Sequence, residues 1–105
     1  MTNNIMSFKE YFKYINRLKK LTSHRRVLLD KLEQIQTDAE IRNLELKTFD
    51  YTYGIERFLN DSEKEYLKLK YINKYSSSIL EAIYHKSIST LYRYEERMLN
   101  KLEVR

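Results

Sequence analysis

The sequence contains no cysteine, no proline and only one glycine, Gly54. Without cysteine, a disulfide framework, a thiolate zinc site and a cysteine nucleophile are excluded, and the composition fits a reducing compartment. With a single glycine, most β-hairpins and any glycine-rich loop that cradles a phosphate are excluded, because such turns need positive φ angles. These absences predict an all-α protein with short polar connections.

Long hydrophobic segments are also missing. The longest apolar run has three residues, whereas a transmembrane helix needs about 20. The N-terminus has no basic segment followed by an apolar stretch, so no signal peptide is expected. We therefore expect a cytoplasmic protein without a membrane partner.

Residue patterns for catalysis or metal binding are scarce. The only histidines are His24 and His85, and neither has a second histidine one helical turn away. The neighbouring Glu95 and Glu96 would point to different faces of a helix, so they do not form an acid–base pair. We expect no metal, no cofactor and no catalytic residue, and so a protein that is not an enzyme.

The charge is moderately basic and unevenly distributed. The chain has 20 Lys and Arg against 15 Asp and Glu, a formal net charge of +5. Eight basic residues and two acids lie in residues 9–31, and six basic residues and two acids lie in residues 64–93. Two basic blocks separated by an acidic one permit a polyanionic partner, although a solvated surface has the same composition.

The N-terminal half begins with an amphipathic helix. Ser7 and Glu10 have the spacing of a capping box. Apolar residues recur after it at spacings of 3 and 4, at Phe8, Tyr11, Ile15 and Leu18. Two continuations remain open: Ser23 caps a second helix, or one helix runs through residues 8–36.

A further helix start and a linker are predicted next. Thr37 and Glu40 repeat the capping-box spacing, and residues 49–54, which hold the only glycine, are the best candidate linker. The predicted division is an N-terminal helical region, residues 1–50, and a second domain, residues 51–105. The N-terminal region is a helical hairpin or a coiled-coil-like extension, and its apolar stripe either packs on the second domain or forms a homodimer.

The second domain reads as a series of short helices. Ser62 and Glu65 have capping-box spacing, and residues 66–72 are apolar on more than one side, which is typical of a central helix. A helix over residues 76–85 follows, then a short break, and Ser87 caps the last helix.

The last helix has two distinct faces. At 100° per residue, its apolar side holds Ile88, Leu91, Tyr92, Met98, Leu99 and Leu102. Glu95 falls within that stripe and therefore needs a polar partner or water. Hydroxyl and basic side chains collect on the opposite face, at Ser89, Thr90, Arg93, Tyr94, Arg97 and Lys101.

These features produce a resemblance to a known family. Residues 62–102 resemble the C-terminal promoter-reading domain of bacterial sigma factors, and are most similar to small phage late-gene transcription regulators of the RinA/ArpU kind. The matching residues are Glu65, Leu67, Leu69, Lys70 and Tyr71, followed by Ser87, Ser89, Thr90, Leu91, Tyr92, Arg93, Arg97, Lys101 and Leu102. Two positions depart from the pattern: His85 replaces the usual turn glycine, and Glu81 replaces a small residue.

The resemblance implies a cytoplasmic DNA-binding regulator of a phage or mobile element, with contact to RNA polymerase as one option. Helix 88–102 would enter the major groove of double-stranded DNA, and a dimer would read half-sites about 34 Å apart. By position, Ser89, Thr90 and Arg93 would approach bases, Arg97 and Lys101 the backbone, and Ser76, Ser77, Ser78 and Lys74 a phosphate. The alternative is a small helical protein–protein interaction module that inhibits or recruits a host or phage protein.

Overall fold

The computed structural model describes residues 6–103, which contain five α-helices, one π-helical segment and no strand. The all-α prediction is confirmed. The helices are α1 (Phe8–Arg25), α2 (Lys31–Phe58), α3 (Asp61–Leu67), η1 (Lys68–Ile72), α4 (Ser77–Tyr84) and α5 (Ile88–Glu103). None of the helices in this part of the chain combines the length and apolar character that a membrane span requires.

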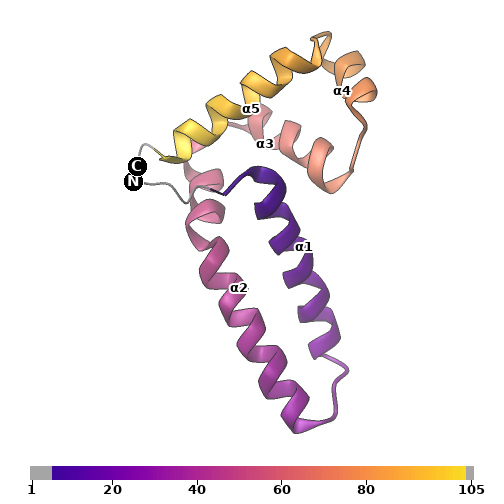
Figure 1. Cartoon of the computed structure of the whole chain (residues 1–105), viewed down its shortest axis with the longest axis vertical. Coiled ribbons are helices and arrows are strands. Elements are labelled where there is room, and N and C mark those ends of the chain that lie inside the picture. The colour runs from indigo at the N-terminus through magenta and orange to yellow at the C-terminus, as the bar shows by residue number, and fades with distance from the viewer. Residues whose placement is uncertain (1–5, 104–105) are drawn as a thin grey trace.

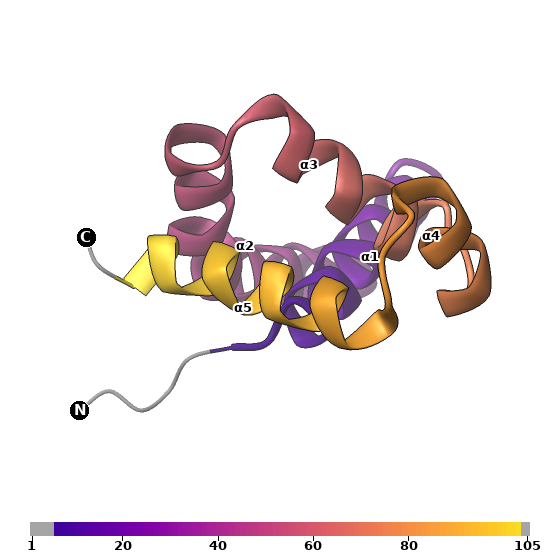
Figure 2. The same cartoon turned by 90° about the horizontal axis from the view of Figure 1, so that it is seen from above.

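The molecule is elongated, with extents of 51 × 33 × 21 Å. The antiparallel hairpin of α1 and α2 forms the long arm, and the shorter helices gather with α5 at one end of it (Figure 1). Seen from above, α5 runs along one side of this C-terminal region, with α3 across from it and α4 at one end (Figure 2).

Local capping determines where α1 and α2 begin. The predicted capping box is confirmed: the Glu10 amide donates to Ser7 Oγ at 3.1 Å, and the Ser7 amide donates to the Glu10 carboxylate at 3.2 Å. Both continuations considered beyond α1 are wrong. The helix ends at Arg25, and α2 begins after Asp30, whose carboxylate accepts the Glu33 amide at 2.9 Å.

α2 continues for 28 residues, through both the predicted helix start at Thr37 and the predicted linker at residues 49–54. Those two predictions are wrong, and the position between residues 50 and 51 lies inside a continuous helix. Gly54 serves close packing rather than a turn. A Cβ atom there would stand 2.9 Å from Leu102 Cδ2, so the missing side chain lets α5 approach α2.

The main core lies in the C-terminal region, and one α1 residue joins it. Its buried members are Phe8, Leu59, Tyr66, Leu67, Leu80, Leu91, Met98 and Leu102. Tyr11 is also buried, and its hydroxyl lies 2.7 Å from the Thr52 hydroxyl of α2. The first turns of the α1 stripe therefore pack within the chain, on α2 and on the C-terminal region.

The C-terminal helices follow the predicted order with one shifted start. Asn60 and Glu63 form the capping box of α3, so the predicted box at Ser62 and Glu65 is wrong by two residues. The Ser76 hydroxyl accepts the Ile79 amide at 3.4 Å at the start of α4. The predicted Ser87 cap is confirmed, because its hydroxyl accepts the Thr90 amide at 3.3 Å.

Glu81 and His85, the two residues that depart from the resembled pattern, together form the turn between α4 and α5. His85 adopts the left-handed conformation expected of the usual glycine, with φ 56° and ψ 41°. The Glu81 carboxylate accepts the Ile88 amide at 2.6 Å. A carboxylate from α4 thus satisfies a free amide at the start of α5 and is favoured there by the helix dipole.

Candidate nucleic-acid interface

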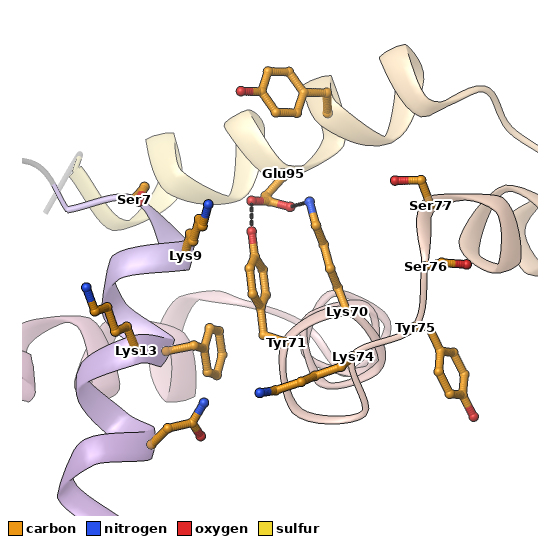
Figure 3. A pocket seen from close by; sticks show the side chains of 13 residues that line it. Ser7, Lys9, Lys13, Lys70, Tyr71, Lys74, Tyr75, Ser76, Ser77 and Glu95 are labelled. Carbon is orange, nitrogen blue, oxygen red and sulfur yellow. Dashed lines mark hydrogen bonds and ion pairs between the residues drawn. The ribbon is translucent and has the colours of Figure 1, made fainter.

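An open cleft of about 820 Å³ separates the start of α1 from η1, the start of α4 and one side of α5. We refer to it as the basic cleft. It is lined by Ser7, Lys9, Phe12, Lys13, Asn16, Lys70, Tyr71, Lys74, Tyr75, Ser76, Ser77, Tyr92 and Glu95. Figure 3 shows Lys9 and Lys13 extending from α1, while Lys74 extends toward α1 from the opposite wall.

The charge of the basic cleft is strongly positive, with four lysines and one glutamate in its lining. Lys70 Nζ lies 2.7 Å from the Glu95 carboxylate, so this lysine is neutralised. Lys9, Lys13 and Lys74 are exposed, and within residues 6–103 none of them forms an ion pair. Three lysines without an ion-pair partner therefore line the cleft, and their positive charge favours an anion there.

A buried polar network fixes the wall between η1 and α5. Glu95 is only 8% exposed and accepts hydrogen bonds from Lys70, Tyr71 and, at 3.5 Å, Tyr66. The predicted need of Glu95 for a polar partner is confirmed (Figure 3). Burial and the adjacent carboxylate raise the pKa of both tyrosines above the usual value, so their hydroxyls stay protonated as donors.

The same wall is tied to α1. The Phe12 ring stacks on the Tyr71 ring with centroids 5.0 Å apart and planes 9° from parallel. η1 has π-helical hydrogen bonding, in which the Asn73 amide donates to the Lys68 carbonyl at 2.9 Å. This wider turn ends the helix ahead of Lys74, whose φ of 58° redirects the chain toward α4.

The start of α4 forms one end of the basic cleft. Ser76 and Ser77 line it, and Ser78 follows as an exposed residue of the first turn. The amides of a first helical turn and the helix dipole favour an anion. Of the residues predicted to contact phosphate, the structure brings Lys74, Ser76 and Ser77 into one cleft.

α5 presents two of the three predicted base-reading residues on its solvent side. Ser89 and Arg93 are exposed there. Tyr92, which the helical pattern placed in the apolar stripe, is 64% exposed and lines the basic cleft. That placement was wrong, because the ring stays open to the cleft.

Thr90 and Arg97 lie apart from the basic cleft. They line a second pocket of about 330 Å³ with Tyr84, Lys86, Leu91 and Tyr94. The Thr90 hydroxyl lies 3.1 Å from the Ser87 hydroxyl, so it has a partner already. These two predicted DNA contacts therefore sit beside an aromatic pocket rather than beside Lys74 and the serines.

Lys101, predicted to contact the DNA backbone, takes part in a structural ion pair. Its ammonium lies 2.6 Å from the carboxylate of Glu63. Glu63 is 5% exposed and also belongs to the α3 capping box. The pair holds the end of α5 on α3, which leaves Lys101 less free for a phosphate than Arg93.

No protein-family model, curated protein or solved structure matches the chain. The site is therefore argued from its own geometry. Within residues 6–103, no cluster of three or more His, Cys, Asp or Glu side chains is placed to hold a metal ion. The sequence did not predict that Lys70 and Tyr71 line the cleft, because only the three-dimensional packing brings η1 to the start of α1.

Proposed function

We propose that the chain is a sequence-specific DNA-binding transcription regulator of a phage or mobile element, acting in the cytoplasm. In this proposal α4, the turn at His85 and α5 work as a helix-turn-helix, and α5 enters the major groove. The observation that supports it is the basic cleft, in which three lysines without an ion pair line the same hollow as the start of α4, beside α5.

Phosphate contacts are assigned to the basic cleft. Lys9 and Lys13 from α1 and Lys74 from the opposite wall supply charge. Ser76, Ser77 and Ser78 supply hydroxyls and first-turn amides. Contacts of this kind fix the register of a protein on the duplex but carry no sequence information.

Base reading is assigned to α5. Arg93 is the strongest candidate, because an exposed guanidinium can donate two hydrogen bonds to guanine in the major groove. Ser89 lies one turn before it and can contact an adjacent base. Thr90, Arg97 and Lys101 lie toward the second pocket and the Glu63 ion pair, so we assign them peripheral contacts.

The position of α5 is held by buried charge. Glu95 joins it to η1 and Glu81 joins its first turn to α4. A recognition helix that is fixed before binding loses less conformational freedom on binding. The resemblance to promoter-reading domains supports an added contact with RNA polymerase, at a surface that leaves the basic cleft free.

The second candidate is a protein–protein interaction module that inhibits or recruits a host or phage protein. The observation in its favour is the apolar outer face of α4, where Ile79 and Ile83 lie one turn apart and are 47% and 45% exposed. Duplex DNA offers little apolar surface to cover such side chains, whereas a protein partner would bury them.

Binding to duplex DNA distinguishes the two candidates. We expect the protein to bind random duplex DNA at low salt, and to prefer a selected site over it. Arg93→Ala should weaken binding to the selected site by about 1–3 kcal/mol and affect random DNA less. Arg26→Ala, an exposed arginine at the far end of the hairpin, is the matched control. Absence of binding at low salt would refute the DNA proposal and favour the protein module.

A further inference from the structure

The outer face of α2 carries large apolar side chains in contact with solvent. Leu32, Ile35, Leu46, Phe49 and Tyr53 are 63%, 64%, 73%, 64% and 47% exposed. α1 lies along one side of α2, and among residues 6–103 no other helix lies along the opposite side (Figure 1). We call this surface the α2 stripe.

The α2 stripe has the spacing of a helix-pairing seam. Together with Ala39 and Arg42, its residues are separated alternately by 3 and 4 positions along 22 residues of one helix. This is the heptad pattern with which two helices pack side by side. The opposite face of α2, which holds Leu44 and Thr48, is already buried.

The area of the α2 stripe is close to what a stable dimer buries. Burying a large apolar side chain removes roughly 100 Å² from water, so the five side chains contribute on the order of 500 Å² per copy. Stems of flanking polar residues add to this. The total approaches the roughly 800 Å² per partner that stable interfaces bury.

The polar residues at seam positions disfavour parallel pairing. A parallel dimer would place Arg42 against Arg42 and Glu56 against Glu56, which puts like charges opposite each other in two layers. An antiparallel pair centred between Ala39 and Arg42 avoids both contacts. Leu32 then meets Phe49 of the second copy, and Ile35 meets Leu46.

The antiparallel pair also accounts for exposed residues outside the α2 stripe. Val27 and Leu29, in the turn between α1 and α2, are 72% and 92% exposed. In this arrangement they face the Tyr53 end of the second copy. A single interface then covers two apolar surfaces that lie at opposite ends of one α2.

Charges near the centre of the pair balance. Asp38 and Glu45 flank Arg42 on the same side of α2, at spacings of 4 and 3 residues. Asp38 is already held by Arg25 at 2.7 Å. Two copies therefore bring four acids and four arginines together, which permits interchain pairing of the Arg42 side chains with the partner acids.

We propose that the chain forms an antiparallel homodimer in which the α2 stripes of two copies pack together. This goes beyond the DNA proposal and does not depend on it. The two α4–α5 units would lie at opposite ends of the dimer, roughly 50 Å apart at the α2 termini by the rise of a helix. Two α5 helices would then not meet half-sites one helical turn apart.

Molar mass in solution, from light scattering or sedimentation, tests the dimer. We expect the full chain to be dimeric at micromolar concentration. Leu46→Glu should raise the dissociation constant at least about 100-fold, since the change falls in both copies. Ile79→Glu, an equally apolar exposed site on α4, should leave the dimer intact. Circular dichroism confirms that each variant stays helical.

Cysteine pairing tests the orientation, because the natural sequence has no cysteine. Ile35→Cys and Leu46→Cys chains should form a disulfide when mixed and oxidised, and neither should cross-link efficiently by itself. A monomeric wild-type chain would overturn the proposal, and the α2 stripe would then be a candidate binding surface for a different protein. Cross-linking of Leu46→Cys only with itself would overturn the antiparallel arrangement.

Discussion

The two ends of the molecule are held together in different ways. In the C-terminal region, side chains from α3, α4 and α5 pack around fully buried residues such as Tyr66 and Met98. Toward the tip of the hairpin, the buried apolar residues are reduced to Leu21 and Leu44. The C-terminal region thus stabilises itself, whereas the hairpin relies on its base and, in our proposal, on a second copy.

Ion pairs show the same contrast. Glu95 and Glu63 are buried and paired with Lys70 and Lys101. In the hairpin, the Arg17–Glu40 pair is about half exposed on both sides, and such pairs contribute little. In our proposals, the first kind of pair holds the DNA-binding surface rigid, whereas the arm that docks on a second copy needs only to stay helical.

The largest expected effect comes from the core. Leu91→Ala should lower the free energy of unfolding by about 2–5 kcal/mol, because Leu91 is 2% exposed and packs within the main core. Leu21→Ala should cost less, because the tip of the hairpin can adjust around it. Urea unfolding followed by circular dichroism measures both. Equal losses would contradict the contrast between the two regions.

Buried and exposed ion pairs should respond differently to the same chemical change. Glu95→Gln should destabilise the protein by roughly 1–3 kcal/mol, because the ammonium of Lys70 and the tyrosine hydroxyls lose a charged acceptor. Glu40→Gln should change stability by no more than about 0.5 kcal/mol. Urea unfolding followed by circular dichroism measures both changes. A larger loss of stability for Glu40→Gln than for Glu95→Gln would contradict the expectation.

Alkaline pH should unfold the protein through the tyrosines. The pKa values of Tyr66 and Tyr71 are raised in the folded state above the ordinary value of 10.0. Folding therefore retains protons that the unfolded chain loses, so their stabilisation is complete below pH 10 and is lost as the pH rises above it. Stability measured from pH 8 to 11 should fall, and less steeply in Tyr71→Phe. If the slope of stability against pH were the same in Tyr71→Phe, the titration of Tyr71 would be excluded as a cause.

Substitution of Gly54 by alanine should have a small effect. In Gly54→Ala the new methyl group would press on Leu102, which is buried, while the helix gains up to about 1 kcal/mol in propensity. We expect a net change within about 1 kcal/mol, and a clear loss for the bulkier Gly54→Val. Thermal unfolding of both variants tests this, and a stabilised Gly54→Val would show that α5 is not tightly packed on α2.

Local signals in the sequence identified much of the C-terminal region. The hydroxyls of Ser7 and Ser87 act as predicted, because a cap depends on residues three positions apart. The charged Glu95 in an apolar stripe correctly indicated a buried polar partner.

Features that depend on contacts between distant parts of the chain could not be predicted from the sequence. The Thr37–Glu40 spacing is equally compatible with the interior of a helix, and nothing in residues 31–58 breaks one, so α2 was divided wrongly. The basic cleft depends on contact between α1 and η1, which are far apart in the chain. The exposure of the α2 stripe could not be predicted either, because an apolar heptad has the same sequence pattern whether the helix that packs on it belongs to the same chain or to another one.

The salt dependence of duplex DNA binding tests the central claim, that the basic cleft holds the phosphate backbone. We compare a Lys9→Gln, Lys13→Gln, Lys74→Gln variant with a control carrying Lys19→Gln, Lys20→Gln and Lys31→Gln, which removes the same charge from exposed residues of the hairpin. Each phosphate contact contributes about 0.9 to the slope of log affinity against log salt concentration. We predict a slope reduced in magnitude by about 2 to 3 in the first variant and nearly unchanged in the control. Equal slopes in the two variants would contradict the account.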